Sequence, residues 1–202
     1  MPGKTSLMKR SAMLVLLGFG LLLAVAWAQT ESVLYSFCAQ TSCADGLYPL
    51  AGVVFDQKGN LYGTTRSGGI DYFNCGDGCG VVFKLTPKGK ETVLYSFCTQ
   101  GYCADGEESL AGLVSDQEGN LYGTTYGGGA YNGCNSSIGC GVVFKLTPEG
   151  KYKVVYSFCA QSGCTDGANP QAGLILDQKG NLYGTTSDGG DYEGGVVFKV
   201  TP

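Results

Sequence analysis

The strongest constraint on how this chain folds is a sequence that it repeats three times. The decapeptide DQKGNLYGTT at residues 56–65 returns as DQEGNLYGTT at 116–125 and as DQKGNLYGTT at 177–186. The shorter motifs YSFC and GVVFK recur with the same spacing. Such self-similarity is typical of solenoids, propellers and other arrays, whose units bury a core by packing on one another. We therefore predict one domain of three tandem repeats, each of about 60 residues, within residues 29–202.

Each period contains four short apolar runs bounded by Gly, Pro, Asp or Asn, namely AGLVSD, NLYGTT, GVVFKLT and YKVVYSF in the second copy. None of them has helical periodicity, so the unit is predicted to be an all-β sheet of four strands. Two of the connections are tight. In the turn DQKGN, Gly59 can supply the positive φ of a hairpin, and Asp56 is placed to bind the turn amides.

Near-continuous apolar strands are expected where both faces of a sheet are covered, as in the blades of a β-propeller. The sequence has a lone copy of the fourth strand, VLYSF, at residues 33–37, and its last third strand, GVVFKVT, covers 195–201. We expect an all-β, propeller-like array of three four-stranded blades. The N-terminal strand is predicted to complete the last blade and so to hide an exposed edge.

These motifs, from the Ala-Gly-apolar run through Asp-x-x-Gly-Asn-Leu-Tyr-Gly-Thr-Thr to Gly-Val-Val-Phe-Lys-Leu-Thr-Pro, resemble the GloVer tandem repeat of exported bacterial proteins. The resemblance covers essentially all of residues 33–202, and the strand order also resembles NHL-type blades. It implies export and a propeller-like repeat, and it brings no known activity or catalytic residue. The cysteine-rich loops depart from the family pattern, and so does the number of repeats, because such proteins often have more than three.

The N-terminal residues 1–28 have the features of a secretory signal peptide. Basic residues precede the apolar run AMLVLLGFGLLLAVAWA, which closes on Ala-Trp-Ala before a polar segment. The alternative is a membrane anchor, for which this run is short. We expect a secreted, periplasmic or cell-surface protein that has no membrane association after cleavage. Residues 29–202 contain 10 Lys and Arg against 17 Asp and Glu, a net charge of −7 that disfavours nucleic acid as a partner.

All ten cysteines follow residue 28, and they occur as five close pairs. An even number in an exported chain predicts disulfides, here between near neighbours. The alternative is a metal site, but the spacing varies, zinc sites favour tighter pairs, and the chain has no histidine. We expect no metal and no cofactor. The predicted bridges are Cys38–Cys43, Cys75–Cys79, Cys98–Cys103, Cys134–Cys140 and Cys159–Cys164.

The loops after YSFC and after NLYGTT are long, and they fall on one face of the predicted propeller. Binding usually uses loops on a rigid scaffold, so ligand contacts are sought there. One aspartate recurs in CADG, CADG and CTDG, where it either binds a cation with its copies or forms an Asp-Gly turn. Three positions later the residue differs among the three repeats, either because it contacts an asymmetric ligand or because the position tolerates sequence drift. The ligand-binding candidates are Asp45, Asp105, Asp166, Tyr48, Glu108 and Asn169.

Enzyme chemistry finds little support. Without histidine there is no imidazole base or triad, and no pair of carboxylates stands out for glycoside hydrolysis. The repeated tyrosine of NLYGTT could stack on sugars or belong to the core. We predict a binding or structural role with no catalytic residues, with a glycan or a cell-surface ligand as partner. The alternative is a propeller lyase or glycosidase that uses carboxylates on the cysteine-rich face.

Three blades are fewer than the four to eight that propellers usually have. Three assemblies therefore remain open: a strained three-blade ring, a homodimer in which two chains make a six-blade ring, or a shortened member of a longer array.

Overall fold

The structure is a computed structural model that describes residues 30–70, 75–131, 133–134 and 139–202. The chain divides into two compact units, residues 1–32 and 33–202, and the second unit is described below. The predicted signal peptide, residues 1–28, lies outside the described residues. Within the described part of the chain, no helix is both long and apolar enough to cross a membrane.

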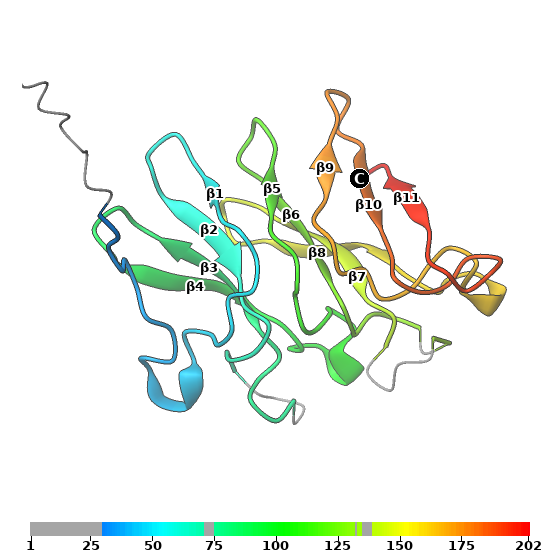
Figure 1. The fold of residues 1–202 in the computed structure, drawn as a ribbon, viewed down its shortest axis with the longest axis horizontal. Helices are drawn as coiled ribbons and strands as arrows, with labels where there is room; N and C mark the ends of the chain where they lie inside the picture. The colour runs from blue at the N-terminus through cyan, green and yellow to red at the C-terminus, as the bar shows by residue number, and fades with distance from the viewer. Residues whose placement is uncertain (1–29, 71–74, 132, 135–138) are drawn as a thin grey trace, which may run out of the picture. The chain divides into compact units, whose positions relative to one another are not determined.

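The described part of residues 33–202 is almost entirely β-structure, arranged as three antiparallel sheets (Figure 1). Within each sheet the strands lie side by side in sequence order, as predicted for propeller-like blades. The first sheet contains β1 (Val54–Phe55), β2 (Leu61–Thr64), β3 (Val81–Leu85) and β4 (Glu91–Ser96). The second contains β5 (Val114–Ser115), β6 (Leu121–Thr125), β7 (Val142–Leu146) and β8 (Tyr152–Ser157). The third contains β9 (Ile175–Leu176), β10 (Leu182–Thr185) and β11 (Val197–Val200).

The first half of the repeated decapeptide is a turn, as its sequence predicts. Gly59 has a φ of +77°, and Asp56 Oδ1 accepts hydrogen bonds from the backbone amides of Lys58 and Asn60 at 2.8 and 2.9 Å. Its other oxygen accepts from the Asn60 side chain at 2.7 Å and from the Tyr62 hydroxyl at 3.0 Å. The hydrogen bonds from Asn60, Tyr62 and the turn amides outweigh partial desolvation and lower the pKa of Asp56 to about 2. The repeated Asp, Gly, Asn and Tyr thus form one turn.

The glycine in the second half of the decapeptide makes room for an aromatic ring. Gly63 in β2 lies directly opposite Phe83 in β3, and a Cβ at Gly63 would be 2.6 Å from the ring. The same pairing recurs in the other two sheets. The glycine is therefore repeated because in each sheet a phenylalanine ring of the third strand packs over this position of the second strand.

Successive sheets pack through the phenylalanine that follows each outer strand. Phe97, after β4, contacts Phe144 of the second sheet with ring centroids 5.3 Å apart, and Phe158 contacts Phe198 of the third sheet at 4.9 Å. The Thr64 hydroxyl also donates a hydrogen bond across the first boundary to the Ala111 carbonyl at 2.8 Å. We call these two boundaries the sheet junctions.

The N-terminal strand does not complete the last sheet of its own chain. Phe37 contacts Phe83 of the first sheet at 4.8 Å, and in the described residues β11 pairs only with β10. The sheets follow one another in a row, which places residues 33–37 and β11 at opposite ends of it in Figure 1. The predicted pairing of VLYSF with the last sheet is therefore wrong within this chain, because three sheets side by side do not return to their starting point.

The two threonines that face the sheet junctions should respond differently to the same substitution. Thr64→Val removes the closer of the two hydroxyl donors at the Ala111 carbonyl, leaving Ser109 at 3.5 Å, and should lower the free energy of unfolding by about 1–2 kcal/mol. Thr124 occupies the same position in β6, but its buried hydroxyl has no hydrogen-bond partner among the described residues, so Thr124→Val should be neutral or slightly stabilising. Urea denaturation of both variants measures the difference. Equal losses would show that the Thr64 hydrogen bond contributes nothing.

Candidate functional site

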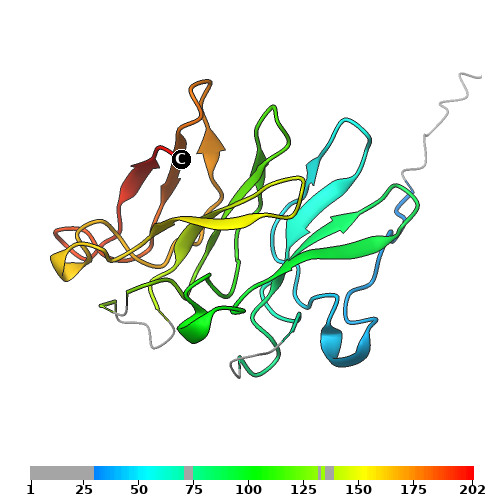
Figure 2. The same cartoon turned by 180° about the vertical axis from the view of Figure 1, so that it is seen from behind.

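The long loops gather along one edge of the sheets. Because β2 and β4 are both antiparallel to β3, they run in the same direction and end at the same edge. The tight β1–β2, β5–β6 and β9–β10 turns project from the opposite edge in both views (Figures 1 and 2). We call the edge with the long loops the loop face. It contains every cysteine and three short 3-10 turns, η1 (Thr41–Cys43), η2 (Gly101–Cys103) and η3 (Ser162–Cys164).

All ten cysteines form disulfides with their near neighbours, which are the five predicted pairs. In the three loops that follow a YSF motif, the bonded cysteines have Cα atoms 4.0 Å apart and enclose one 3-10 turn each. Tyr102, at the tip of the second of these loops, has a φ of +57°. These bridges hold short, tightly curved loops and do not join distant parts of the chain.

The repeated aspartates of CADG and CTDG each stabilise the loop to which they belong. Asp105 Oδ2 accepts hydrogen bonds from the Tyr95 hydroxyl at 2.6 Å and the Thr99 amide at 2.9 Å, and Oδ1 accepts from the Gln100 amide at 3.1 Å. Tyr35 and Tyr156 make the equivalent bonds to the other two aspartates at 2.7 and 2.6 Å. None of these aspartates belongs to a described cluster of side chains close enough to share a metal ion.

Burial and hydrogen bonding act in opposite directions on the pKa of the Asp45 carboxyl group. Desolvation would raise the pKa of Asp45, but hydrogen bonds from Tyr35 and the backbone outweigh it and lower the pKa. Desolvation and the bond to Asp45 together raise the pKa of Tyr35 to about 12. The ionised aspartate and neutral tyrosine therefore persist across the physiological pH range.

Removing one of these tyrosine hydroxyls should loosen its loop. Tyr95→Phe takes away the bond to Asp105 and is expected to lower the free energy of unfolding by about 1–2 kcal/mol, measured by urea denaturation. Tyr102→Phe is the matched control, because that side chain is 96% exposed, and it should change stability by less than about 0.5 kcal/mol. Equal effects in the two variants would contradict an anchoring role for the Asp105–Tyr95 pair.

Two of the three positions at which the copies differ lie beside the sheet junctions. The Arg66 guanidinium forms an ion pair with Glu108 at 3.1 Å, and the Asn169 amide donates to the Tyr126 carbonyl at 2.9 Å. Arg66 and Tyr126 occupy equivalent positions after β2 and β6, so each junction has its own matched pair. The Tyr48 side chain, by contrast, is 52% exposed. Glu108 and Asn169 thus have partners inside the protein, and Tyr48 is the most open of the six predicted ligand residues.

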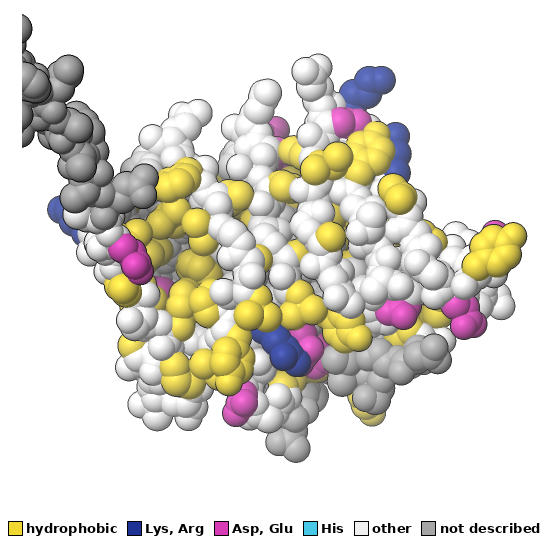
Figure 3. Space-filling model, viewed as in Figure 1, with side chains coloured by type: hydrophobic (Ala, Val, Ile, Leu, Met, Phe, Trp, Pro, Cys, Tyr) yellow, Lys and Arg dark blue, Asp and Glu magenta, His cyan; other side chains and the backbone are white. Residues whose placement is uncertain are grey.

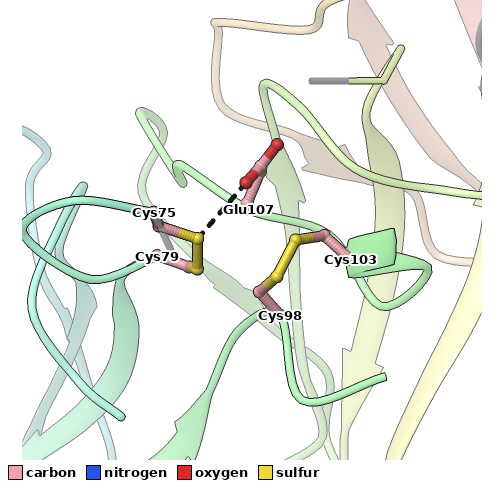
Figure 4. Close-up of side chains that lie close together, drawn as sticks. All are labelled: Cys75, Cys79, Cys98, Cys103 and Glu107. Carbon is pink, nitrogen blue, oxygen red and sulfur yellow. Dashed lines mark hydrogen bonds between the residues drawn. A yellow bond between two sulfur atoms is a disulfide. The ribbon is translucent and has the colours of Figure 1, made fainter. Parts of the chain in front are cut away.

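Two disulfides from successive loops meet at the first junction (Figure 4). Four sulfur atoms and one carboxylate oxygen lie within 4.8 Å of one another there. They belong to Cys75, Cys79, Cys98, Cys103 and Glu107. The sulfurs of Cys140, Cys159 and Cys164 gather in the same way at the second junction. While the sulfurs are bonded in pairs there is no thiolate to bind a metal ion, so the clusters pack the loops together.

Glu107 is the unexpected member of the first cluster. Its side chain is buried, and Oε2 is 3.5 Å from Cys75 Sγ. Burial, followed by the nearby charges of Glu108 and Asp105, raises the pKa of Glu107 to about 7. A disulfide sulfur has no hydrogen to donate, so this contact is a hydrogen bond only when the carboxyl is protonated. Sequence reasoning missed Glu107. The equivalent positions of the other two repeats hold the apolar residues Leu47 and Ala168, and a charged residue among them was the available signal.

The loop face also presents aromatic side chains to solvent. The side chains of Tyr102 and Tyr192 are 96% and 97% exposed, and Tyr131 is 43% exposed. They belong to three different loops, two of which are closed by disulfides close by in sequence. The tyrosines of the repeated NLYGTT motif are instead half-buried or buried and bind the turn aspartates. The chemistry that the loop face offers is therefore recognition by exposed rings on stiffened loops.

The comparison with models of protein families supports a repeat protein. The model of the family described as the Gloeobacter/Verrucomicrobia repeat matches residues 24–202. A solved structure described as a gluconolactonase from a structural genomics project is 15% identical, with a TM-score of 0.39. The match covers 74% of this chain and 47% of that protein, so the chain spans about half its length. No curated protein matches the chain.

Proposed function

This chain belongs to the Gloeobacter/Verrucomicrobia repeat family, and from that premise we propose that it is an exported, disulfide-stapled binding protein of the cell surface or the extracellular space. Its ligand is proposed to be a glycan or another cell-surface polymer. The role rests on the loop face and requires no catalytic residue.

The observation that carries this proposal is the exposure of Tyr102 and Tyr192, at 96% and 97%, on the loop face. Aromatic rings with a polar tip supply large contact area at little cost in conformational entropy. The disulfide between Cys98 and Cys103 closes the loop around Tyr102, so less freedom is lost when a ligand binds. Apolar faces of sugar rings are suitable partners for such side chains.

Export is supported by the number and the kind of disulfides. Bridges persist in oxidising compartments and are rare in the cytosol. Mapping of peptides without reduction, on protein recovered from the medium or the periplasm, should find five bridges between near neighbours. Free thiols, or bridges between different repeats, would contradict the proposal.

The binding role is tested with an array of glycans and cell-wall polysaccharides, followed by titration of each hit. Tyr102→Ala and Tyr192→Ala should weaken binding by roughly tenfold or more each, as expected for loss of an aromatic anchor. The control is Phe55→Ala, since Phe55 is an aromatic residue that is 69% exposed on β1, away from the loop face. Absence of any hit, or binding that none of the tyrosine substitutions weakens, would overturn the proposal.

A further inference from the structure

The two sheet junctions within the chain show which surfaces a sheet uses to bind its neighbours. On one side of the first and second junctions, Val82 of β3 and Val143 of β7 are fully buried. On the other side, Leu113 and Leu174 are each 4% exposed. Each pair comes from equivalent positions in the repeat, so the two junctions have the same construction.

The same positions are open at the two ends of the row of sheets. Val197 of β11 corresponds to Val82 and Val143 but is 82% exposed. Val53 corresponds to Leu113 and Leu174 but is 45% exposed, and Tyr48 and Leu50 beside it are 52% and 61% exposed. Hydrophobic side chains gather over the first sheet in Figure 3. The first sheet therefore presents one half of a junction, and the third sheet presents the other half.

The same two ends of the row also have segments without a strand partner in the described residues. VLYSF at residues 33–37 is identical to VLYSF at 93–97, which includes the end of β4. Phe97 packs on the following sheet while the residues before it pair with β3. Phe37 also packs on the sheet that follows it, but the described residues give its segment no strand partner. The outer edge of β11 is likewise unpaired in the described part of the chain.

We propose that a second copy of this chain covers both ends, so that residues 33–37 of each copy pair with β11 of the other. The two new junctions repeat the two internal ones. A ring of two chains contains six sheets, which is within the usual range of propellers. An interface between unlike ends closes into a symmetric ring when the rotation allows it.

The pairing of β3 with β4 inside the first sheet predicts the register of this pairing. Val82 pairs with Tyr95, and Phe83 pairs with Val93. The corresponding pairs join Val197 to Tyr35 of the second copy, and Phe198 to Val33 of the second copy. The Phe97 amide donates to the Gly80 carbonyl at 3.0 Å, so the Phe37 amide of one copy should donate to the Gly195 carbonyl of the other.

The position of these segments explains why the occupant is a second copy. Residues 33–37 and β11 lie at opposite ends of the row (Figure 1), so these two segments do not pair with each other within the described part of one chain. The missing partner of β11 is an outer strand with the sequence pattern VLYSF, and the missing cover of Val53 is a third strand with the pattern GVVFK. A second copy supplies both, already positioned on folded sheets.

The test is the mass of the exported protein in solution, measured by sedimentation equilibrium over a range of concentrations, with Val197→Lys as the variant. Lysine is tolerated at an 82% exposed position of the single chain but buries an unpaired charge in the proposed junction. It should weaken self-association by roughly 100-fold. The control is Tyr102→Lys, which makes the same change in charge at a 96% exposed position outside the junction.

Hydrogen exchange separates this pairing from other modes of dimerisation. The amides of residues 33–37 and of β11 should be protected in the wild-type protein and in Tyr102→Lys, and should exchange in Val197→Lys. A mass of two chains with this pattern supports the proposal. A monomer at every concentration, open polymers, or a dimer that Val197→Lys leaves intact would overturn it.

Discussion

Replacing Glu107 with glutamine should raise the free energy of unfolding at pH 8 by about 2–3 kcal/mol and leave it nearly unchanged at pH 4. In the folded protein the pKa of this carboxyl is raised from 4.5 to about 7, chiefly by burial. A raised pKa means that the folded state holds the proton more tightly than the unfolded state does. The protonated Glu107 carboxyl therefore contributes its full stabilisation of the folded state below about pH 4.5, and this stabilisation is lost as the pH rises through 7.

Urea denaturation of the oxidised protein at intervals from pH 4 to pH 8 measures this effect. The wild-type protein should become less stable relative to Glu107→Gln over that range. Glu108→Gln is the matched control, because Glu108 is the next residue and its side chain forms an ion pair with Arg66 at the surface. That control should lose about 1 kcal/mol or less. If Glu107→Gln and Glu108→Gln respond alike to pH, then Glu107 is not a buried proton-binding group.

Gly123→Ala should lower the free energy of unfolding by about 2–3 kcal/mol, because it overpacks the centre of the second sheet. A Cβ at Gly123 would lie 2.6 Å from the Phe144 ring and 2.9 Å from Leu113. Phe144 is fully buried and is held by Phe97 of the preceding sheet, so its ring has no free space to move into. The added methyl group therefore disturbs both the sheet and the first junction.

Gly101→Ala is the matched control for this substitution, because the equivalent positions of the other repeats already carry Thr41 and Ser162. Among the described residues nothing beyond the adjacent chain lies within 4 Å of an added Cβ at Gly101, and the alanine restricts the unfolded chain, so this variant should be neutral or more stable by up to about 1 kcal/mol. Urea denaturation compares the two. Adding Phe144→Leu to Gly123→Ala should restore part of the loss, because the smaller side chain removes the clash. Equal stability of Gly123→Ala and the wild-type protein would refute the packing role of this glycine.

The sequence by itself determined the features that depend on short-range contacts. The repeat and its apolar runs predicted the all-β sheets, and Gly59 with Asp56 predicted the turn, since a positive φ and an acceptor for turn amides are local requirements. The five disulfides were predictable for the same reason, as each joins cysteines only four to six residues apart. The repeated aspartates bind the amides of their own loops, as the turn alternative predicted, and their tyrosine partners were not foreseen.

Only the tertiary structure decided what depends on one sheet meeting the next. It brought Arg66 to Glu108, 42 residues apart, and it buried Glu107 between two disulfides. It also placed Phe37 on the first sheet, which corrected the predicted pairing with the last one. Three nearly identical repeats have the same local sequence, so nothing local distinguishes an inner sheet from an end sheet. The difference between a buried Val143 and an exposed Val197 arises from the presence or absence of a neighbouring sheet.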